Sequence, residues 1–297
     1  MYLFQKIEEL MMEYNDARRD IGKFILNEKG NILNYSMKEV AELTYTSKPT
    51  LVRFAKALGY NGWKEFIKAF TEETFYQQTS GIYTDPNFPF SEGDTVKDII
   101  LSLKNLQIES IMDTVDLLDP KMVDKATDIL YNANNIVIYG VSPNTFNAHI
   151  FRRKMLSIGK NVVVASSNEA GLLSSTLTKN DCAIVISYSG NNKTKEPLCY
   201  IKSLQDKEIP LIAITSGGNN YLRENIECVF TISSRERLYS KISNFSTDQS
   251  ISFILNTLYS SYFAKDYRNN LQYKIRNAEI LEEPRMTTLS NVMEKRY

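Results

Sequence analysis

Apolar residues in the first 70 positions recur at the spacing of α-helices. They form three stripes: Ile21, Phe24 and Ile25; Met37, Val40, Ala41 and Thr44; and Leu51, Phe54, Ala55 and Leu58. Ser36 and Glu39 are spaced as a capping box, and Ser47 is a suitable N-cap for the third stripe. Pro49 fits the first turn of that helix, and Gly59 fits its end. The pattern predicts an all-α unit with helices over 37–43 and 47–57.

The pattern changes after position 135, where short continuous apolar runs replace the helical stripes. The runs cover residues 136–139, 162–165, 183–186, 211–214 and 229–232. Continuous runs rich in β-branched residues are typical of parallel strands that are buried on both faces. Helix-length segments separate several of the runs, which indicates an α/β fold with a five-stranded parallel sheet. Further helices are predicted over 96–131 and 247–264, the second capped by Ser246.

Residues 77–95 separate the two patterns and hold two prolines, two glycines and many small polar residues. This composition predicts a linker. A length of 297 residues also favours two domains over one. We therefore expect a helical domain at 1–76, a linker at 77–95 and an α/β domain at 96–297.

Composition narrows the classes of function. The 35 basic and 35 acidic residues balance, so a surface that attracts an anionic partner must be local. Three scattered cysteines and a single histidine offer no zinc-ligand pattern, and we expect neither a metal nor a cofactor. The sequence has no apolar run long enough to span a membrane, and its start does not have the pattern of a signal peptide. We expect a cytoplasmic protein without a membrane partner.

The two short helices at 37–43 and 47–57 have the spacing of a helix-turn-helix motif. Residues 44–70 hold five basic residues against one acidic residue, a local excess suited to a phosphate backbone. If the apolar stripe of the second helix faces inward, its polar residues face outward, where the start of such a helix can enter the major groove. The predicted DNA-contacting residues are Ser47, Lys48, Thr50, Arg53 and Lys56. A helical hairpin with a solvated basic face remains an alternative on spacing and charge alone.

The string SMKEVAELTYTSKPTLVRFAKALGYNGWKEF resembles the N-terminal helix-turn-helix domain of RpiR-type bacterial transcription regulators. The resemblance covers roughly residues 15–70 and includes TLVRF within the second helix and LGY at its end. It implies a double-stranded DNA operator as a partner. Trp63 stands where the family usually has an aromatic or apolar residue, and we expect it to pack.

Hydroxyl-rich loops follow three of the predicted strands. They cover residues 140–144, 187–194 and 233–236. In an open α/β sheet, ligands bind at the carboxyl ends of the strands, and a helix start beside hydroxyl groups suits a phosphate. We expect Ser142 to be an N-cap with Pro143 as first helical residue, and Lys193 and Lys195 to lie at the start of a helix. The alternative is that these serines are only caps and turn residues.

Residues 135–265 resemble a SIS (sugar isomerase) domain, which has a flavodoxin-like fold and is the usual partner of this helix-turn-helix domain. The resemblance implies that Ser142, Ser187 and Ser189 bind the phosphate of a sugar phosphate. The other candidate ligand-binding residues are Asn144, Gly190, Asn192, Thr194 and Glu236. Glu236 matches an acidic residue that the family often has after the last strand, and we expect it to contact sugar hydroxyls. The chain departs from the family pattern Ser-x-Ser-Gly-x-Thr, because Asn192 occupies the threonine position unless an insertion brings Thr194 there.

SIS domains occur in isomerases as well as in regulators, so the fold alone does not decide the function. An aldose–ketose isomerase needs a base beside the reacting carbon. His149 lies within a predicted helix, and Glu236 is the only evident base near the loops. We expect no enzyme and no catalytic residue, but a homodimeric or higher-order regulator of sugar metabolism whose DNA affinity responds to a phosphorylated sugar. The alternatives are a sugar-phosphate isomerase with an accessory helical domain, and a regulator whose sugar site has decayed.

Overall fold

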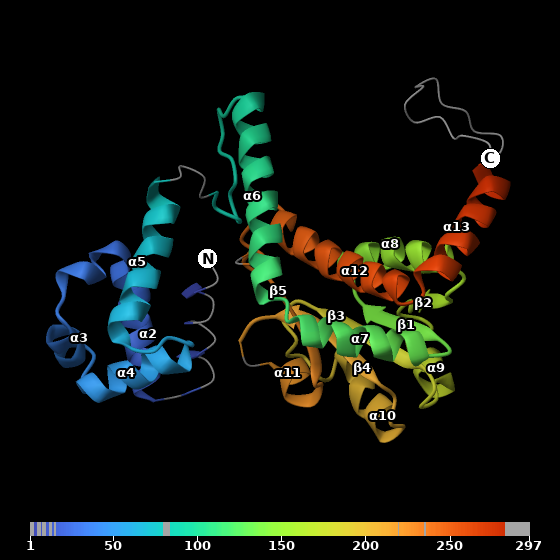
Figure 1. The fold of residues 1–297 in the computed structure, drawn as a ribbon, viewed down its shortest axis with the longest axis horizontal. Coiled ribbons are helices and arrows are strands. Elements are labelled where there is room, and N and C mark those ends of the chain that lie inside the picture. Colours follow the sequence, from blue (N-terminus) through green and yellow to red (C-terminus); the bar gives the residue numbers. More distant parts are fainter. Residues whose placement is uncertain are drawn as a thin grey trace.

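The computed structural model describes residues 16–79, 84–218, 220–234 and 236–282, together with Leu3, Phe4, Ile7, Leu10, Met11 and Tyr14. Figure 1 shows a helical unit formed by the first part of the chain and an α/β unit formed by the second. Residues 80–83 of the predicted linker, and residues 283–297 of the predicted α/β domain, lie outside the described residues.

The helical unit contains α2 (Ala17–Glu28), η1 (Lys29–Asn34), α3 (Met37–Leu43), α4 (Lys48–Ala57) and α5 (Trp63–Thr79). The predicted capping box begins α3: Ser36 Oγ accepts the Glu39 N–H at 3.2 Å, and Glu39 Oε2 accepts the Ser36 N–H at 2.7 Å. Ser47 is the N-cap residue of α4 as predicted, but its side chain makes no bond to the helix backbone. The helix-turn-helix is therefore α3, the turn at 44–46 and α4.

The apolar stripes of these helices meet in one core. Leu51, Phe54 and Ala55 of α4 have no exposed surface, and Phe54 packs edge to face against Phe66 of α5. Trp63 is 8% exposed, which confirms that it packs. Because α4 buries one side completely, its opposite side is left to face solvent.

The α/β unit is built on a parallel sheet with the strand order β2-β1-β3-β4-β5, which confirms the predicted fold class. The strands are β1 (Ile136–Gly140), β2 (Val162–Val164), β3 (Cys182–Ser187), β4 (Leu211–Ser216) and β5 (Cys228–Ile232). Gly140 pairs with Ile186, and Ser187 pairs with Thr215. The carboxyl ends of β1, β3 and β4 therefore lie side by side.

Helices cover both faces of the sheet. One face packs against α7 (Pro120–Asn132), α8 (Asn144–Leu156) and α12 (Phe245–Lys265). The other packs against α9 (Ala170–Thr176), η2 (Leu198–Tyr200), α10 (Ile201–Asp206) and α11 (Tyr221–Asn225). Figure 1 shows α8 and α12 on one side of the sheet and α9, α10 and α11 on the other. α6 (Val96–Leu117) packs on α12, and α13 (Tyr267–Glu282) follows α12.

Two local predictions need correction. Ser246 is not the N-cap of α12, because the helix begins at Phe245 and the Ser246 hydroxyl lies 2.5 Å from the Ser110 hydroxyl of α6. The segment predicted as a linker also contains the end of a helix and several buried residues. α5 runs to Thr79, and Thr84, Pro86, Asn87 and Pro89 are buried. Among the described residues, no helix is long and apolar enough to cross a membrane.

Candidate functional site

The outer side of α4 carries the residues predicted to contact DNA. Lys48, Arg53 and Lys56 are exposed, whereas Leu51 and Phe54 on the opposite side are fully buried. Ser47 and Thr50 lie at the start of the helix, where their hydroxyl oxygens are 2.9 Å apart. The helix therefore presents three cations and two paired hydroxyl groups on its solvent-facing side, as the sequence pattern predicts.

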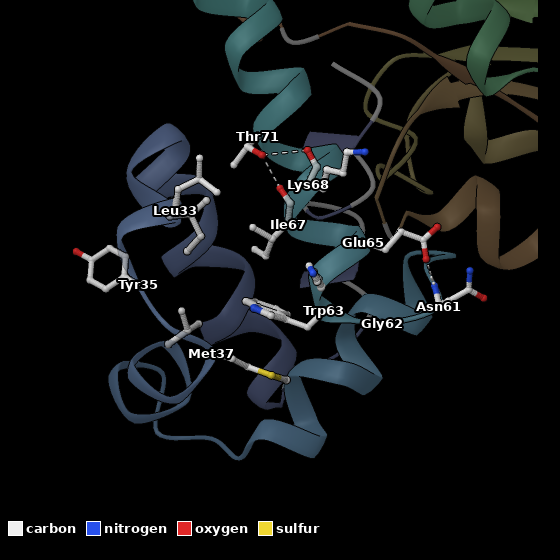
Figure 2. Close-up of a pocket in the computed structure, with 13 residues that line it drawn as sticks. Leu33, Tyr35, Met37, Asn61, Gly62, Trp63, Glu65, Ile67, Lys68 and Thr71 are labelled. Carbon is white, nitrogen blue, oxygen red and sulfur yellow. Dashed lines mark hydrogen bonds between the residues drawn. The ribbon is translucent and has the colours of Figure 1, made fainter.

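An open hollow of about 860 Å³ lies beside the helix-turn-helix, between the η1–α3 segment and α5. Figure 2 shows Leu33, Ile67 and Trp63 around it. Two of its polar groups are engaged within the chain: Glu65 Oε2 accepts the Asn61 N–H at 2.9 Å, and Thr71 Oγ1 donates to the Ile67 carbonyl at 2.8 Å. The hollow is thus largely apolar, with Lys64 and Lys68 as the cations in its lining.

The loop after β3 is held tightly against the end of β4. Ser187 Oγ accepts the Gly190 N–H at 3.3 Å, and the Gly190 carbonyl accepts the Leu222 N–H at 3.2 Å. Gly190 has a φ of +62°, and a Cβ there would lie 2.5 Å from both Asn220 Oδ1 and Thr215 Oγ1. Only glycine fits this position. The tight turn leaves Ser189 exposed next to the buried Ser187.

The loop after β1 lies beside this turn because β1 and β3 are neighbours. Ser142 is exposed, and Asn144 is 7% exposed at the first position of α8. The prediction that Ser142 caps α8 is wrong, because the N-cap is Pro143 and no side chain bonds to the helix start. Ser142 is thus an exposed hydroxyl group just beyond the carboxyl end of β1.

The expectation that a helix starts directly after residues 187–190, here called the serine turn, is also wrong. Residues 188–197 form a loop, and the helical backbone begins only at Leu198. Pro197 explains the delay, since a proline disfavours helical geometry in the residue before it. Lys193 and Lys195 therefore do not lie at a helix start, and Thr194 Oγ1 instead donates to Asn192 Oδ1 at 3.0 Å.

Glu236 follows β5 and holds the start of α12. Its side chain has no exposed surface. Oε1 accepts the backbone N–H groups of Ser246 at 2.5 Å and Thr247 at 3.3 Å, and Oε2 accepts the Thr247 hydroxyl at 2.7 Å. The Lys241 ammonium lies 3.2 Å from Oε2. The sequence predicts a contact with sugar hydroxyls here, but the structure gives the carboxylate a full set of partners within the chain.

The charge of Glu236 also affects its neighbour Asp248. Burial, together with the charge of Glu236, raises the pKa of the Asp248 carboxyl, and Lys241 offsets part of that rise. Asp248 Oδ1 has no hydrogen-bond partner among the described residues. Lys241 is therefore the cation that balances two carboxyl groups at the start of α12, and its position in sequence gave no sign of that role.

Two family profiles match the chain in series. Residues 1–76 match the helix-turn-helix domain of the rpiR family, and residues 129–255 match the SIS domain. The chain belongs to the RpiR family. An uncharacterized HTH-type transcriptional regulator from Clostridium perfringens is 21% identical to this RpiR-family chain over 95% of this chain and 99% of the relative. The chain is thus a transcriptional regulator with a SIS domain.

Solved structures place the RpiR-family chain in the same fold. The Vibrio vulnificus NanR protein, solved in complex with ManNAc-6P, matches with a TM-score of 0.57 at 19% identity, covering 96% of this chain and all of that one. A putative sugar-phosphate isomerase from Listeria monocytogenes matches with a TM-score of 0.53 at 16% identity, covering 62% of this chain and 98% of that one. The fold is therefore shared with the NanR protein and with a putative sugar-phosphate isomerase.

Replacing Glu236 by alanine in this RpiR-family chain is expected to lower the free energy of unfolding by about 3 kcal/mol, because Lys241 loses its ion pair with a fully buried carboxylate and the start of α12 loses its acceptor. Urea denaturation of the full chain measures the loss. Glu227→Ala is the matched control, since Glu227 also pairs with a lysine, Lys125, but its side chain is 90% exposed. The control should unfold like the parent, and equal losses for the two variants would contradict the role given to Glu236.

Proposed function

We propose that the chain is a DNA-binding regulator of sugar metabolism whose operator affinity is set by a phosphorylated sugar in the SIS domain. The observation that carries this proposal is the presence, in one chain, of the cationic face of α4 and the serine turn after β3. The complex of NanR with ManNAc-6P supports the class of ligand. The proposed domains are 1–76 for DNA and 96–297 for the sugar phosphate, and operator binding assigns the protein to the cytoplasm.

In this proposal, the phosphate lies at the adjoining ends of β1 and β3. Ser142 and Ser189 are exposed and are able to donate to an anion. Ser187 accepts from Gly190 and keeps its own hydroxyl hydrogen for a phosphate oxygen. Asn144, Gly190, Asn192 and Thr194 complete the two loops. Because its carboxylate is already occupied, Glu236 acts in this site through Lys241 and α12 rather than as a direct sugar contact.

The second candidate function is sugar-phosphate isomerisation, which the fold of the Listeria protein favours. Isomerisation needs a base that reaches the substrate. Glu236 is buried, and its carboxylate is already bound by Ser246, Thr247 and Lys241. His149 is an exposed residue in the second turn of α8. Incubating the purified chain at high concentration with hexose and hexosamine 6-phosphates tests the choice. We expect no conversion, and sustained turnover would favour the isomerase.

We further propose that the regulator is at least a homodimer joined through its α/β domain. α6 exposes Leu101, Ile108, Met112 and Val115 by 42–56%, and their spacing places them on one side of the helix. An exposed apolar stripe of this kind suits a second copy, and a two-fold operator suits a dimer. Sedimentation of the full chain at micromolar concentration should give at least twice the mass of one chain. A single-chain mass would contradict the proposal.

A further inference from the structure

Residues 84–90, here called the connector, stand between the helical unit and α6 in sequence. They contact the segment that follows β5 in the α/β unit. Asn87 is at the centre of this contact and is 7% exposed. Its Oδ1 accepts the Arg237 N–H at 2.7 Å, and its carbonyl accepts the Ile242 N–H at 2.9 Å. Its own N–H groups donate to Asp85 Oδ1. Every polar group of Asn87 is therefore used, and two of its bonds hold residues 236–242.

Residues 236–242, here called the β5 loop, contact both the connector and Tyr188 of the serine turn. Lys241 in this loop lies 5.8 Å from the centre of the Tyr188 ring. The Tyr188 hydroxyl donates to the Glu236 carbonyl at 2.8 Å and to the Ser234 carbonyl at 3.3 Å. Tyr188 stands between Ser187 and Ser189 in sequence. One side chain thus separates the proposed phosphate site from the loop that the connector holds.

The β5 loop is also tied to the helix that follows the connector. Glu236 accepts the N–H of Ser246 at the start of α12, and the Ser246 hydroxyl meets Ser110 of α6. One turn further along, Thr114 of α6 donates to Ser250 of α12 at 2.8 Å. All of these groups are buried. A displacement of the β5 loop would therefore act on the connector directly and on α6 through α12.

We propose that Asn87 couples the effector site to the DNA-binding domain, with the β5 loop as the moving part between them. The inference rests on the proposed function. An anion at the serine turn adds negative charge on the Tyr188 side of Lys241, where it competes with Glu236 for the ammonium group. A ligand changes DNA affinity only by favouring one arrangement of the protein over another. The connector contacts the β5 loop and stands between the helical unit and α6 in sequence, so it carries that difference.

The test compares Asn87→Ala with Asn135→Ala in the full chain. Asn135 makes a similar side-chain bond, to Asp181 Oδ1 at 2.8 Å, but just before the amino end of β1. Calorimetry with ManNAc-6P, glucose 6-phosphate and fructose 6-phosphate gives the Kd for the sugar. Titration of an operator selected from random DNA, with and without the bound sugar, gives the coupling ratio.

The parent chain and Asn135→Ala should show a coupling ratio within the usual range of about 5- to 150-fold. Asn87→Ala should reduce the ratio to near one while the Kd for the sugar stays within about threefold of the parent value, because sugar binding and response occur at different residues. Exchange of the Arg237 amide hydrogen should become faster in Asn87→Ala without any ligand, which confirms in solution that Asn87 holds the β5 loop.

The outcomes separate this inference from the proposed function. If no sugar phosphate changes the DNA affinity of the parent chain, the proposed function fails and the coupling role fails with it. If the parent responds and Asn87→Ala responds equally, the coupling role of Asn87 alone is overturned. Unchanged exchange of the Arg237 amide in the variant would overturn the contact on which the inference depends.

Discussion

Replacing Lys48 and Arg53 together by alanine is expected to weaken operator binding by about 100-fold at physiological salt, since a hydrogen bond to a charged phosphate contributes on the order of 1.5–3 kcal/mol. Both side chains are exposed on α4, whose other side is buried in the core of the helical unit. The fold should survive the change because neither residue packs. Loss of phosphate contacts should also flatten the salt dependence of the binding constant, by about 0.9 in slope for each contact removed.

The matched control removes the same charge elsewhere. Lys23 on α2 and Lys179 in the α/β unit are both exposed, and Lys23→Ala with Lys179→Ala should keep nearly the parent affinity. Fluorescence anisotropy with the selected operator measures both double variants. Parent-like affinity for Lys48→Ala with Arg53→Ala would show that α4 is not the recognition helix.

Ser189→Ala is expected to make the regulator blind to its sugar phosphate. A hydrogen bond to a charged group contributes about 1.5–3 kcal/mol, so the Kd for the sugar should rise roughly 10- to 100-fold. Ser142→Ala should have a smaller effect of the same kind. DNA affinity of the ligand-free variants should stay at the parent value, because Ser142 and Ser189 are exposed and lie in the other domain from α4.

Calorimetry on the full chain tests the second prediction, with Ser175→Ala as control. Ser175 is an exposed serine of α9 whose hydroxyl bonds locally to the Leu172 carbonyl, so its removal should leave the Kd for the sugar unchanged. If Ser189→Ala binds every sugar phosphate as well as the parent, the serine turn is not the effector site. If the parent binds none of them, the chain is a regulator with a decayed sugar site.

Local patterns in the sequence predicted the elements on which the proposed function depends. The five strands and the two helices of the helix-turn-helix follow from continuous and helical apolar spacing, which are properties of neighbouring residues. The outward direction of Lys48 and Arg53 follows from the same spacing, as their positions in the structure confirm. The serine turn was found because hydroxyl groups and a glycine gather directly after a strand.

Contacts between residues far apart in the sequence could not be predicted from local patterns. Glu236 supplies the partner for the start of α12 from outside the helix, so Ser246 was free to bond to α6. Asn87 and Arg237 are 150 positions apart, and a segment rich in proline and glycine gives no sign of what it packs against. Pro197 did carry a local signal, because a proline delays the helix that was expected directly after the serine turn.

The affinity of the full chain for its selected operator, measured with and without a saturating sugar phosphate, tests the proposed function most directly. ManNAc-6P, glucose 6-phosphate and fructose 6-phosphate are the first ligands to compare. We expect at least one of them to change the operator Kd by about fivefold or more, the lower end of typical coupling between two sites. The same operator Kd with every sugar phosphate, including any that calorimetry shows to be bound, would contradict it.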